Sequence, residues 1–302
     1  MALFESNHVS SSGQRRRKII RMSGQSCGIG PILCAPLIRK TDQALIDLLR
    51  SLSAAEWELE TIAGSWKVRD VAAHLLDTPL RKLSLVRDSF FAESVGIHGP
   101  QNLVALVNRL NREGVTVYRR LSPPVLIELM QIACRQSALF HESLDPFAPA
   151  AFAVSWAGEE QSLNWFDTAR ELTERWHHQQ QIRLATNRPG IVVPELYHPV
   201  LDCFMRALPH LYRDVEAPSG TTLVVEIPGE CGGRWFLSRA PARWEFVPEG
   251  AQELAARVIV PPELAWRVFT KGIDRRSARA QIEIEGDAAL GERVLNLTAI
   301  VG

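Results

Sequence analysis

Two side chains four residues apart, Glu174 and His178, have the types and the spacing that bind a metal ion. The segment around them, from about Leu163 to Ala185, has the pattern of a long helix that ends at Asn187. Residues four apart on a helix lie on one face, about one turn apart. A carboxylate oxygen and an imidazole nitrogen placed in this way reach one divalent cation at about 2.0–2.2 Å. We therefore predict that Glu174 and His178 are metal ligands.

A catalytic zinc site usually takes three protein ligands and leaves one position for water or substrate. His74 is the best third ligand, because it lies in a second expected helix, from Trp66 to about Phe90, and bundles build metal sites from facing helices. We expect Ser65 to cap this helix and Pro79 to kink or split it. Its polar stripe consists of Asp70, His74, Asp77 and Arg81. A structural zinc would need a fourth protein ligand, for which only His177 or Asp77 is at hand.

Four neighbours of the Glu174/His178 pair receive more specific expectations. Glu171 and Gln181 lie on the same stripe and could orient the ligands. His177 is rotated by about 100° from His178, so the two rings do not easily face one site. Arg183 has two open roles, a bidentate contact to a substrate carboxylate or a solvated place on the surface.

The chain as a whole predicts two parts of different character. After residues 1–30, which are too polar and too rich in Ser, Gly and Arg to build a core, helical patterns fill residues 31–190. Helices are expected near 37–52, 66–90, 102–120, 123–144 and 163–185. Strand-like alternation follows around residues 223–227, 235–237, 244–246, 256–260 and 280–284, with helices at 261–270 and from Asp287 to Leu297. We therefore expect a two-domain α+β protein, with the boundary at 190–197 and a compact α+β domain at 198–302.

Composition limits the kinds of partner. Of the 302 residues, 34 are basic and 34 acidic, and a formal net charge of zero gives no reason for general attraction to nucleic acid or to an anionic membrane. A small-molecule substrate suits this balance better. No apolar run approaches the roughly 20 residues of a membrane span, and the basic run before Ile19 lacks the apolar stretch of a signal peptide, so we expect a cytoplasmic protein. Met22 is a second candidate start codon. The odd number of cysteines, five, indicates free thiols.

The stretch from Trp66 to Leu75, Trp-x-Val-Arg-Asp-Val-Ala-Ala-His-Leu, resembles the signature of the mycothiol-dependent maleylpyruvate isomerase N-terminal domain, a DinB-like metal-binding helical bundle. Glu174 and His178 match that family's Glu-x-x-x-His motif, and the resemblance implies that His74, Glu174 and His178 bind the metal. Residues 269–272 and 286–290 resemble the isomerase C-terminal domain, a small sterol-carrier-like α+β fold. The resemblance covers about residues 31–302. It departs at Gln181, where many members carry aspartate.

This resemblance implies a metal-dependent enzyme, with zinc as the expected ion and a low-molecular-weight thiol such as mycothiol as cosubstrate. The expected reaction is isomerisation or S-transfer on a small electrophilic substrate, because a coordinated thiol loses its proton and becomes a nucleophile. Two alternatives stay open from the residues alone. The same three ligands serve a metal-assisted hydrolase, and a chain with a poorly aligned site would be a non-catalytic metal-binding or ligand-binding protein.

Overall fold

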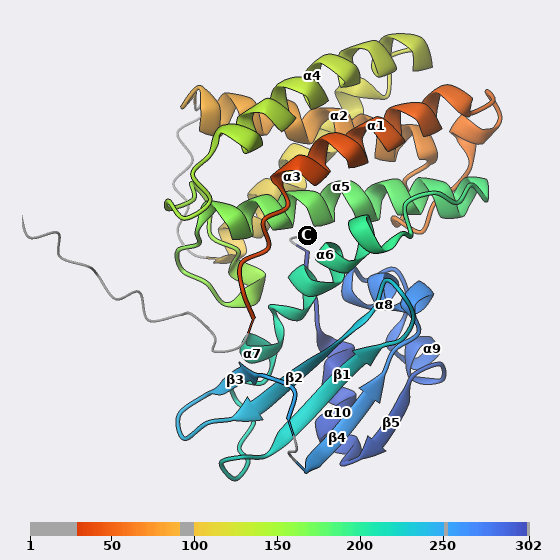
Figure 1. The fold of residues 1–302 in the computed structure, drawn as a ribbon. Helices are drawn as coiled ribbons and strands as arrows, with labels where there is room; N and C mark the ends of the chain where they lie inside the picture. The colour runs from red at the N-terminus through yellow and green to blue at the C-terminus, as the bar shows by residue number, and fades with distance from the viewer. Residues whose placement is uncertain (1–28, 91–99, 251–252, 301–302) are drawn as a thin grey trace, which may run out of the picture.

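The computed structural model describes residues 29–90, 100–250 and 253–300, and places a helical part before a mixed α+β part (Figure 1). This order confirms the expected fold class. The expected N-terminal extension, residues 1–30, lies outside the described residues except for Ile29 and Gly30.

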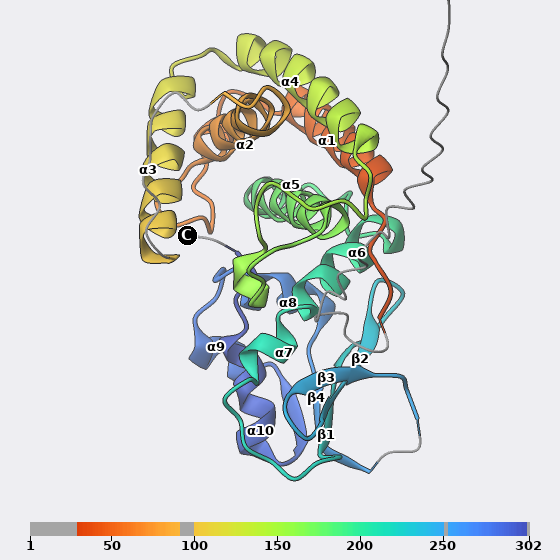
Figure 2. The same ribbon diagram turned by 90° about the vertical axis from the view of Figure 1, so that its left-hand side faces the viewer.

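The helical part is a bundle in which α5 packs against α1 and α2, while α4 covers the outer side of α1 and α2 (Figure 2). Apolar residues face inward on each helix; α4, for example, buries Leu126, Met130 and Ala133 against its neighbours. The long helices are α1 (Ala35–Ser51), α2 (Val68–Lys82), α3 (Pro100–Tyr118), α4 (Pro123–Ser143) and α5 (Asn164–Thr186). Their positions agree with the sequence pattern to within a few residues, apart from α2.

Helix α2 differs from expectation at both ends. It begins at Val68, and its first turn is capped by the Asp70 carboxylate, which accepts a hydrogen bond from the Lys67 backbone N–H at 3.1 Å; the expected cap, Ser65, lies outside. Pro79 does not split the helix, which continues to Lys82 and then widens into the π-helical turn η2 (Leu83–Arg87). In a π-helical turn the backbone hydrogen bonds span five residues instead of four. This change in the hydrogen-bond pattern lies close to Pro79, which has no backbone N–H to donate.

Helix α3 lies unusually close to α2 because position 114 is a glycine. A Cβ atom at Gly114 would come within 2.4 Å of the Asp77 carboxylate. The Arg81 guanidinium pairs with Asp77 at 2.6 Å and donates a hydrogen bond to the Asn111 side chain at 2.7 Å. Asp77 and Arg81, two members of the polar stripe, therefore serve the contact between α2 and α3.

The second part is built on a five-stranded sheet of order β3-β2-β1-β4-β5. Only β1 and β4 run parallel; the other neighbours are antiparallel. On β1, Val225 pairs with Trp235 of β2 and with Val258 of β4. The strands are β1 (Thr222–Ile227), β2 (Gly233–Arg239), β3 (Trp244–Val247), β4 (Leu254–Ile259) and β5 (Glu283–Gly286). The last expected strand, 280–284, is thus shifted, because Ala280 closes a short helix that the sequence analysis missed, α9 (Arg275–Arg279).

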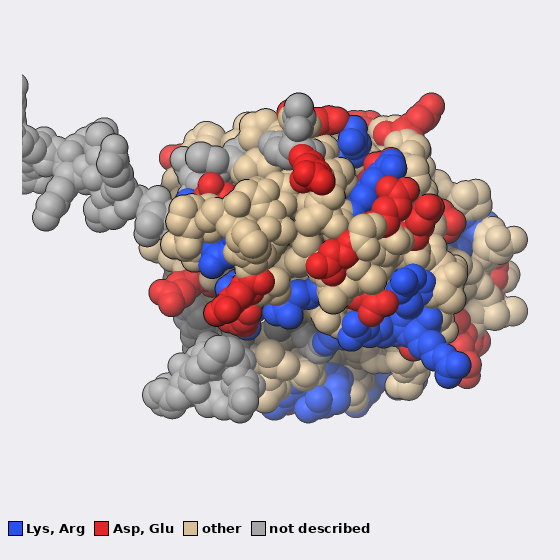
Figure 3. Space-filling view, turned by 90° about the horizontal axis from the view of Figure 1, so that it is seen from below, with Lys and Arg blue, Asp and Glu red and all other residues tan. Residues whose placement is uncertain are grey.

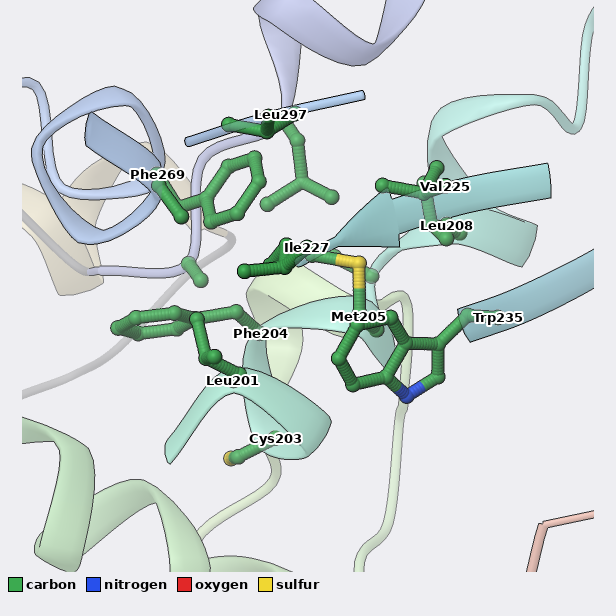
Figure 4. Packing of buried hydrophobic residues seen from close by; sticks show 14 of the residues in the cluster. Leu201, Cys203, Phe204, Met205, Leu208, Val225, Ile227, Trp235, Phe269 and Leu297 are labelled. Atoms are coloured by element: carbon green, nitrogen blue, oxygen red, sulfur yellow. The ribbon is translucent and has the colours of Figure 1, made fainter. Parts of the chain in front are cut away.

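Further helices cover one face of this sheet. Figure 4 shows Leu201, Phe204 and Met205 of α6 close to Val225 and Ile227 of β1 and to Phe269, all of them buried. These helices are α6 (Pro194–Met205), α7 (Leu208–Leu211), α8 (Pro262–Phe269) and α10 (Ala288–Glu292). The expected final helix is shorter than predicted and ends as a 3-10 turn, η4 (Arg293–Asn296).

The two parts share one buried apolar cluster. Helix α6 begins at Pro194, inside the segment expected to be a linker, and packs on α5. Trp176 of α5 stacks on Tyr197 of α6 with ring centroids 4.3 Å apart, and its edge meets Trp266 of α8 at 6.2 Å. Burial of these rings joins the bundle to the α+β part through a continuous core.

The distribution of surface charge and the state of the cysteines agree with what the composition predicts. On the face in Figure 3, acidic and basic side chains are interspersed, as the zero net charge suggests. Within the described ranges, no helix combines the length and apolarity that a bilayer crossing requires. Cys34, Cys134, Cys203 and Cys231 are free, as expected, and Cys27 lies outside the described residues.

Candidate metal centre

Helices α2 and α5 bring His74, Glu174 and His178 together, although His74 is 100 residues from Glu174 and 104 from His178 in sequence. One ligand atom of each residue lies within 4.8 Å of the other two. The His178 Nε2 atom is 3.6 Å from the Glu174 Oε2 atom, and the His74 and His178 rings are 4.6 Å apart between centroids. This spacing suits three ligands around one ion, since atoms bonded to a common zinc at about 2.0–2.2 Å lie within roughly twice that distance of each other.

The three side chains differ in exposure. The His74 residue is only 3% exposed, whereas the side chains of His178 and Glu174 retain 12% and 24% of their exposure. The group is therefore buried at His74 and partly open to solvent at Glu174 and His178. No further His, Cys, Asp or Glu joins the group among the described residues. Three candidate protein ligands are fewer than the four that a structural zinc site needs.

A hydrogen bond orients the ring of His178, whereas one ring nitrogen of His74 has no hydrogen-bond partner among the described residues. The His178 Nδ1 atom lies 2.8 Å from the Gln181 Oε1 atom. An Nδ1–H donating to this oxygen leaves Nε2 with its lone pair, on the side of Glu174. The Nδ1 atom of His74 is buried and has no hydrogen-bond partner among the described residues. A buried polar atom without a partner is costly in a protein, and a metal ion nearby is one way to account for it.

The protonation states favour cation binding. Burial, followed by the nearby His178, lowers the pKa of His74 well below its usual value, so its imidazole is neutral. Burial raises the pKa of Glu174, but the neighbouring groups His178, His177 and Arg170 outweigh that effect and bring it to about 2. Neutral imidazole and ionised carboxylate are the forms that coordinate metal.

We expect Gln181→Ala to weaken zinc binding about 10–100-fold, the usual cost of losing a group that orients a ligand. Without the amide oxygen, the His178 ring loses the hydrogen bond that fixes its tautomer. Competition titration with a zinc chelator measures the effect. Gln180→Ala, one position away and outside this hydrogen bond, is the matched control. Equal zinc affinity in Gln181→Ala and the wild type would remove Gln181 from the site.

Two other neighbours have different roles. His177 is buried, and its Nδ1 atom lies 2.8 Å from the Thr173 carbonyl oxygen of the same helix, so it is held away from the ligand group although its ring is 4.0 Å from that of His178. The Glu171 carboxylate accepts hydrogen bonds from Arg170 at 2.7 Å and from Arg175 at 3.0 Å. The expectation that Glu171 orients the metal ligands is therefore corrected, because its oxygens serve a buried ionic cluster.

Arg183 fits neither of its two expected roles. It is only 8% exposed, and its guanidinium donates hydrogen bonds to the carbonyl oxygens of Pro189 at 2.7 Å and Ala44 at 3.0 Å. These bonds fasten the C-terminal end of α5 to the following loop and to α1. The side chain is thus a structural connector, neither a substrate contact nor a solvated surface group.

A cavity that the sequence analysis missed lies beside the ligand group. The Trp66 ring is 5.1 Å from the His74 ring and 6.3 Å from the His178 ring, and it also lines a hollow of about 250 Å³. The wall opposite comes from α3, where Arg112 and Arg119 project on one face two turns apart. The seven-residue spacing of these two arginines, which places them on one face of a helix, is the sequence feature that could have predicted this wall of the cavity.

Comparison with known proteins identifies the helical part. Residues 38–183 match the model of the mycothiol maleylpyruvate isomerase N-terminal domain. These residues belong to that family. The match contains all three candidate ligands and ends at Arg183, so the candidate metal centre lies wholly within the matched residues.

Two solved structures of mycothiol-dependent maleylpyruvate isomerase, one of them a histidine-to-alanine mutant, match most of the chain more distantly. They have TM-scores of 0.49 and 0.48 and identities of 12% and 11%, and each match covers 79% of this chain and 88% of the other. A UbiJ-SCP2 ubiquinone synthesis protein matches with a TM-score of 0.21 and 18% identity, over 26% of this chain and 69% of the other. No curated protein matches the sequence significantly.

Proposed function

We propose that the chain is a metal-dependent enzyme that uses a low-molecular-weight thiol, mycothiol or a similar compound, for isomerisation or S-transfer on a small electrophilic substrate. The observation that carries this proposal is the group of three ligand atoms within 4.8 Å of each other, without a fourth His, Cys, Asp or Glu among the described residues. Membership of residues 38–183 in the isomerase N-terminal domain family supports the thiol chemistry.

The ligands that we assign to a divalent ion, zinc in the first place, are His74, Glu174 and His178. Two nitrogens and one carboxylate oxygen are a donor set that zinc enzymes use, and the unpartnered His74 Nδ1 atom fits a bound cation. When bound, the ion supplies a deprotonated thiol at neutral pH, because a coordinating thiol loses its proton. The chain's own contribution is to hold three ligands in a group that stays partly open to solvent at Glu174 and His178.

The cavity next to Trp66 is where we place the electrophilic substrate. Trp66 lines this cavity and lies 5.1 Å from the His74 ring, so the cavity is next to the ligand group, although none of the three ligands lines it. Lys67, Arg112 and Arg119 make its lining mainly basic, with Asp70 as the one acidic group. Basic side chains and the half-buried indole of Trp66 suit a small, planar, negatively charged molecule.

The proposed reaction needs no reagent other than the thiol and the electrophilic substrate. The thiol sulfur forms a bond to one carbon of an activated double bond, and the electron pair of that double bond moves to the activating carbonyl. In an isomerisation, rotation about the resulting single bond is followed by return of the electron pair and departure of the sulfur. In an S-transfer to a double bond, the proton that the thiol lost is added to the neighbouring carbon and the new sulfur–carbon bond remains. With a chlorodinitrobenzene-type acceptor, chloride instead leaves the ring carbon that the sulfur attacked.

We expect turnover to depend on both the metal and a thiol. Zinc-loaded protein with mycothiol and a maleyl substrate, or with a chlorodinitrobenzene-type acceptor, should react at least about 100-fold faster than the same protein without thiol or after chelation. Product formation followed by absorbance or chromatography measures this. Turnover of ester or amide substrates at a rate independent of thiol would favour a hydrolase instead, and zinc-loaded protein inactive with all of these substrates would point to a binding protein.

A further inference from the structure

The outer face of α4 carries an apolar stripe that the fold leaves uncovered. Val125, Leu129, Ile132 and Leu139 are between 40% and 56% exposed. In Figures 1 and 2, α4 forms the outer edge of the bundle, and no other described helix or strand lies over this face. The inner face of the same helix packs against the bundle, where it buries Leu126, Met130 and six other residues.

The spacing of the stripe is that of a helix–helix seam. Val125, Ile132 and Leu139 follow one another at intervals of seven, and Leu129 lies between the first two. Single exposed apolar residues are common on protein surfaces. A column of β-branched and leucine side chains at heptad spacing is different. It forms a continuous apolar strip along the helix, which is the surface that packs against another helix.

The charges beside the column determine which partner fits. Glu128 lies in the N-terminal half of the stripe and Arg135 in the C-terminal half, both exposed, and neither forms an ion pair within the described part of the chain. A second copy of α4 running in the opposite direction would place the Glu128 of each chain close to the Arg135 of the other. A parallel copy would instead bring like charges together.

We propose that the chain forms a two-fold symmetric dimer in which α4 packs antiparallel on α4 of a second copy, centred on Ile132. About this centre, Val125 of one chain faces Leu139 of the other, so the column is complementary to itself, as a two-fold interface requires. The column runs from Val125 to Leu139, which is about 21 Å along the helix. A contact of this size is at the small end of specific interfaces, so we expect dissociation constants roughly in the micromolar range.

Sedimentation velocity of the full chain over a concentration series tests this dimer. We expect a monomer–dimer equilibrium in the wild type and a dissociation constant at least about 100-fold higher in Ile132→Glu, which buries two like charges at the axis. Val117→Glu, which charges a 53% exposed valine on α3, is the matched control and should leave the equilibrium unchanged. A chain with no dimer up to about 1 mM, or a dimer that Ile132→Glu does not weaken, overturns the proposal.

Charge exchange and cross-linking test the orientation. Arg135→Glu alone should weaken the dimer about tenfold, because it faces Glu128 of the other copy, and adding Glu128→Arg should restore it. In a background with Cys27→Ser and Cys231→Ser, Ile132→Cys should form an intermolecular disulfide on mild oxidation. Val125→Cys should do so only when mixed with Leu139→Cys. A disulfide formed by Val125→Cys alone as readily as by Ile132→Cys would overturn the antiparallel arrangement.

Discussion

Replacing His178 by alanine is expected to reduce zinc affinity by at least about 100-fold, because a three-ligand site then keeps only two protein ligands. The same result is expected for His74→Ala and Glu174→Gln, since each removes one donor atom from the group within 4.8 Å. The wild type should hold about one zinc ion per chain after gel filtration in the presence of the metal. Elemental analysis by mass spectrometry and a chelator competition titration measure content and affinity.

The sequence neighbour His177 provides the control for this experiment. His177→Gln removes a more deeply buried imidazole from the same helix, and one whose Nδ1 atom is engaged with the Thr173 carbonyl oxygen. It should retain zinc binding within about threefold of the wild type. Equal zinc content in His178→Ala and the wild type would show that the ligand assignment is wrong, whereas equal losses in His178→Ala and His177→Gln would indicate damage to α5 as a whole.

The two candidate ligands that lie on one helix could be predicted from the sequence. Glu174 and His178 need only a regular helix to share a face, and α5 is a regular helix from Asn164 to Thr186. His74 is a different case, because no local pattern reveals which face of α2 meets α5. The resemblance of the Trp66–Leu75 segment to a known family supplied that link, and the packing of α2 on α5 bears out the proximity of the three side chains.

The roles of the other polar residues on these helices depended on contacts far away in sequence. Arg183 bonds to the carbonyl oxygen of Ala44, which is 139 residues distant. Glu171 shares a face with Glu174, but its partner Arg175 reaches Ser137 of α4 and Asp42 of α1. Helical spacing states which residues share a face of one helix, and it cannot state which other helix covers that face. For the same reason the sequence pattern placed the first residues of α6, 194–197, in the linker, because the apolar residues of this helix pack against both α5 and the sheet.

The ionic cluster that occupies Glu171 leads to the largest expected effect on stability. Arg175 is 4% exposed, pairs with Asp42 at 3.2 Å and donates hydrogen bonds to the Glu171 carboxylate and the Ser137 hydroxyl. Arg175→Met keeps the apolar stem of the side chain but leaves the Asp42 carboxylate buried without its cation. Removal of one partner of a buried ion pair costs about 3–5 kcal/mol, so the free energy of unfolding should fall by that amount.

Denaturant unfolding at about pH 7, with zinc content measured in parallel, checks this expectation. Arg39→Met is the control, since Arg39 also pairs with a glutamate across two helices, Glu142, but its side chain is 49% exposed, and its loss should leave the free energy of unfolding almost unchanged. Zinc binding should survive in Arg175→Met, because the cluster does not supply a metal ligand. A loss below about 1 kcal/mol in Arg175→Met would mean that the buried pair contributes no more than a surface pair.

The pH dependence gives a second signature of the same change. Burial raises the pKa of Asp42 to about 6, and the charge of Arg175 is the main effect that opposes this rise. Without Arg175 the folded-state pKa of Asp42 should rise further, whereas in the unfolded chain it is near 3.9. A carboxyl group with a raised folded-state pKa binds more protons in the folded state, so its contribution to stability is lost as the pH rises. The destabilisation by Arg175→Met should therefore be larger at about pH 8 than at about pH 5.5, and an equal loss at both would contradict the burial of an unpaired Asp42 carboxylate.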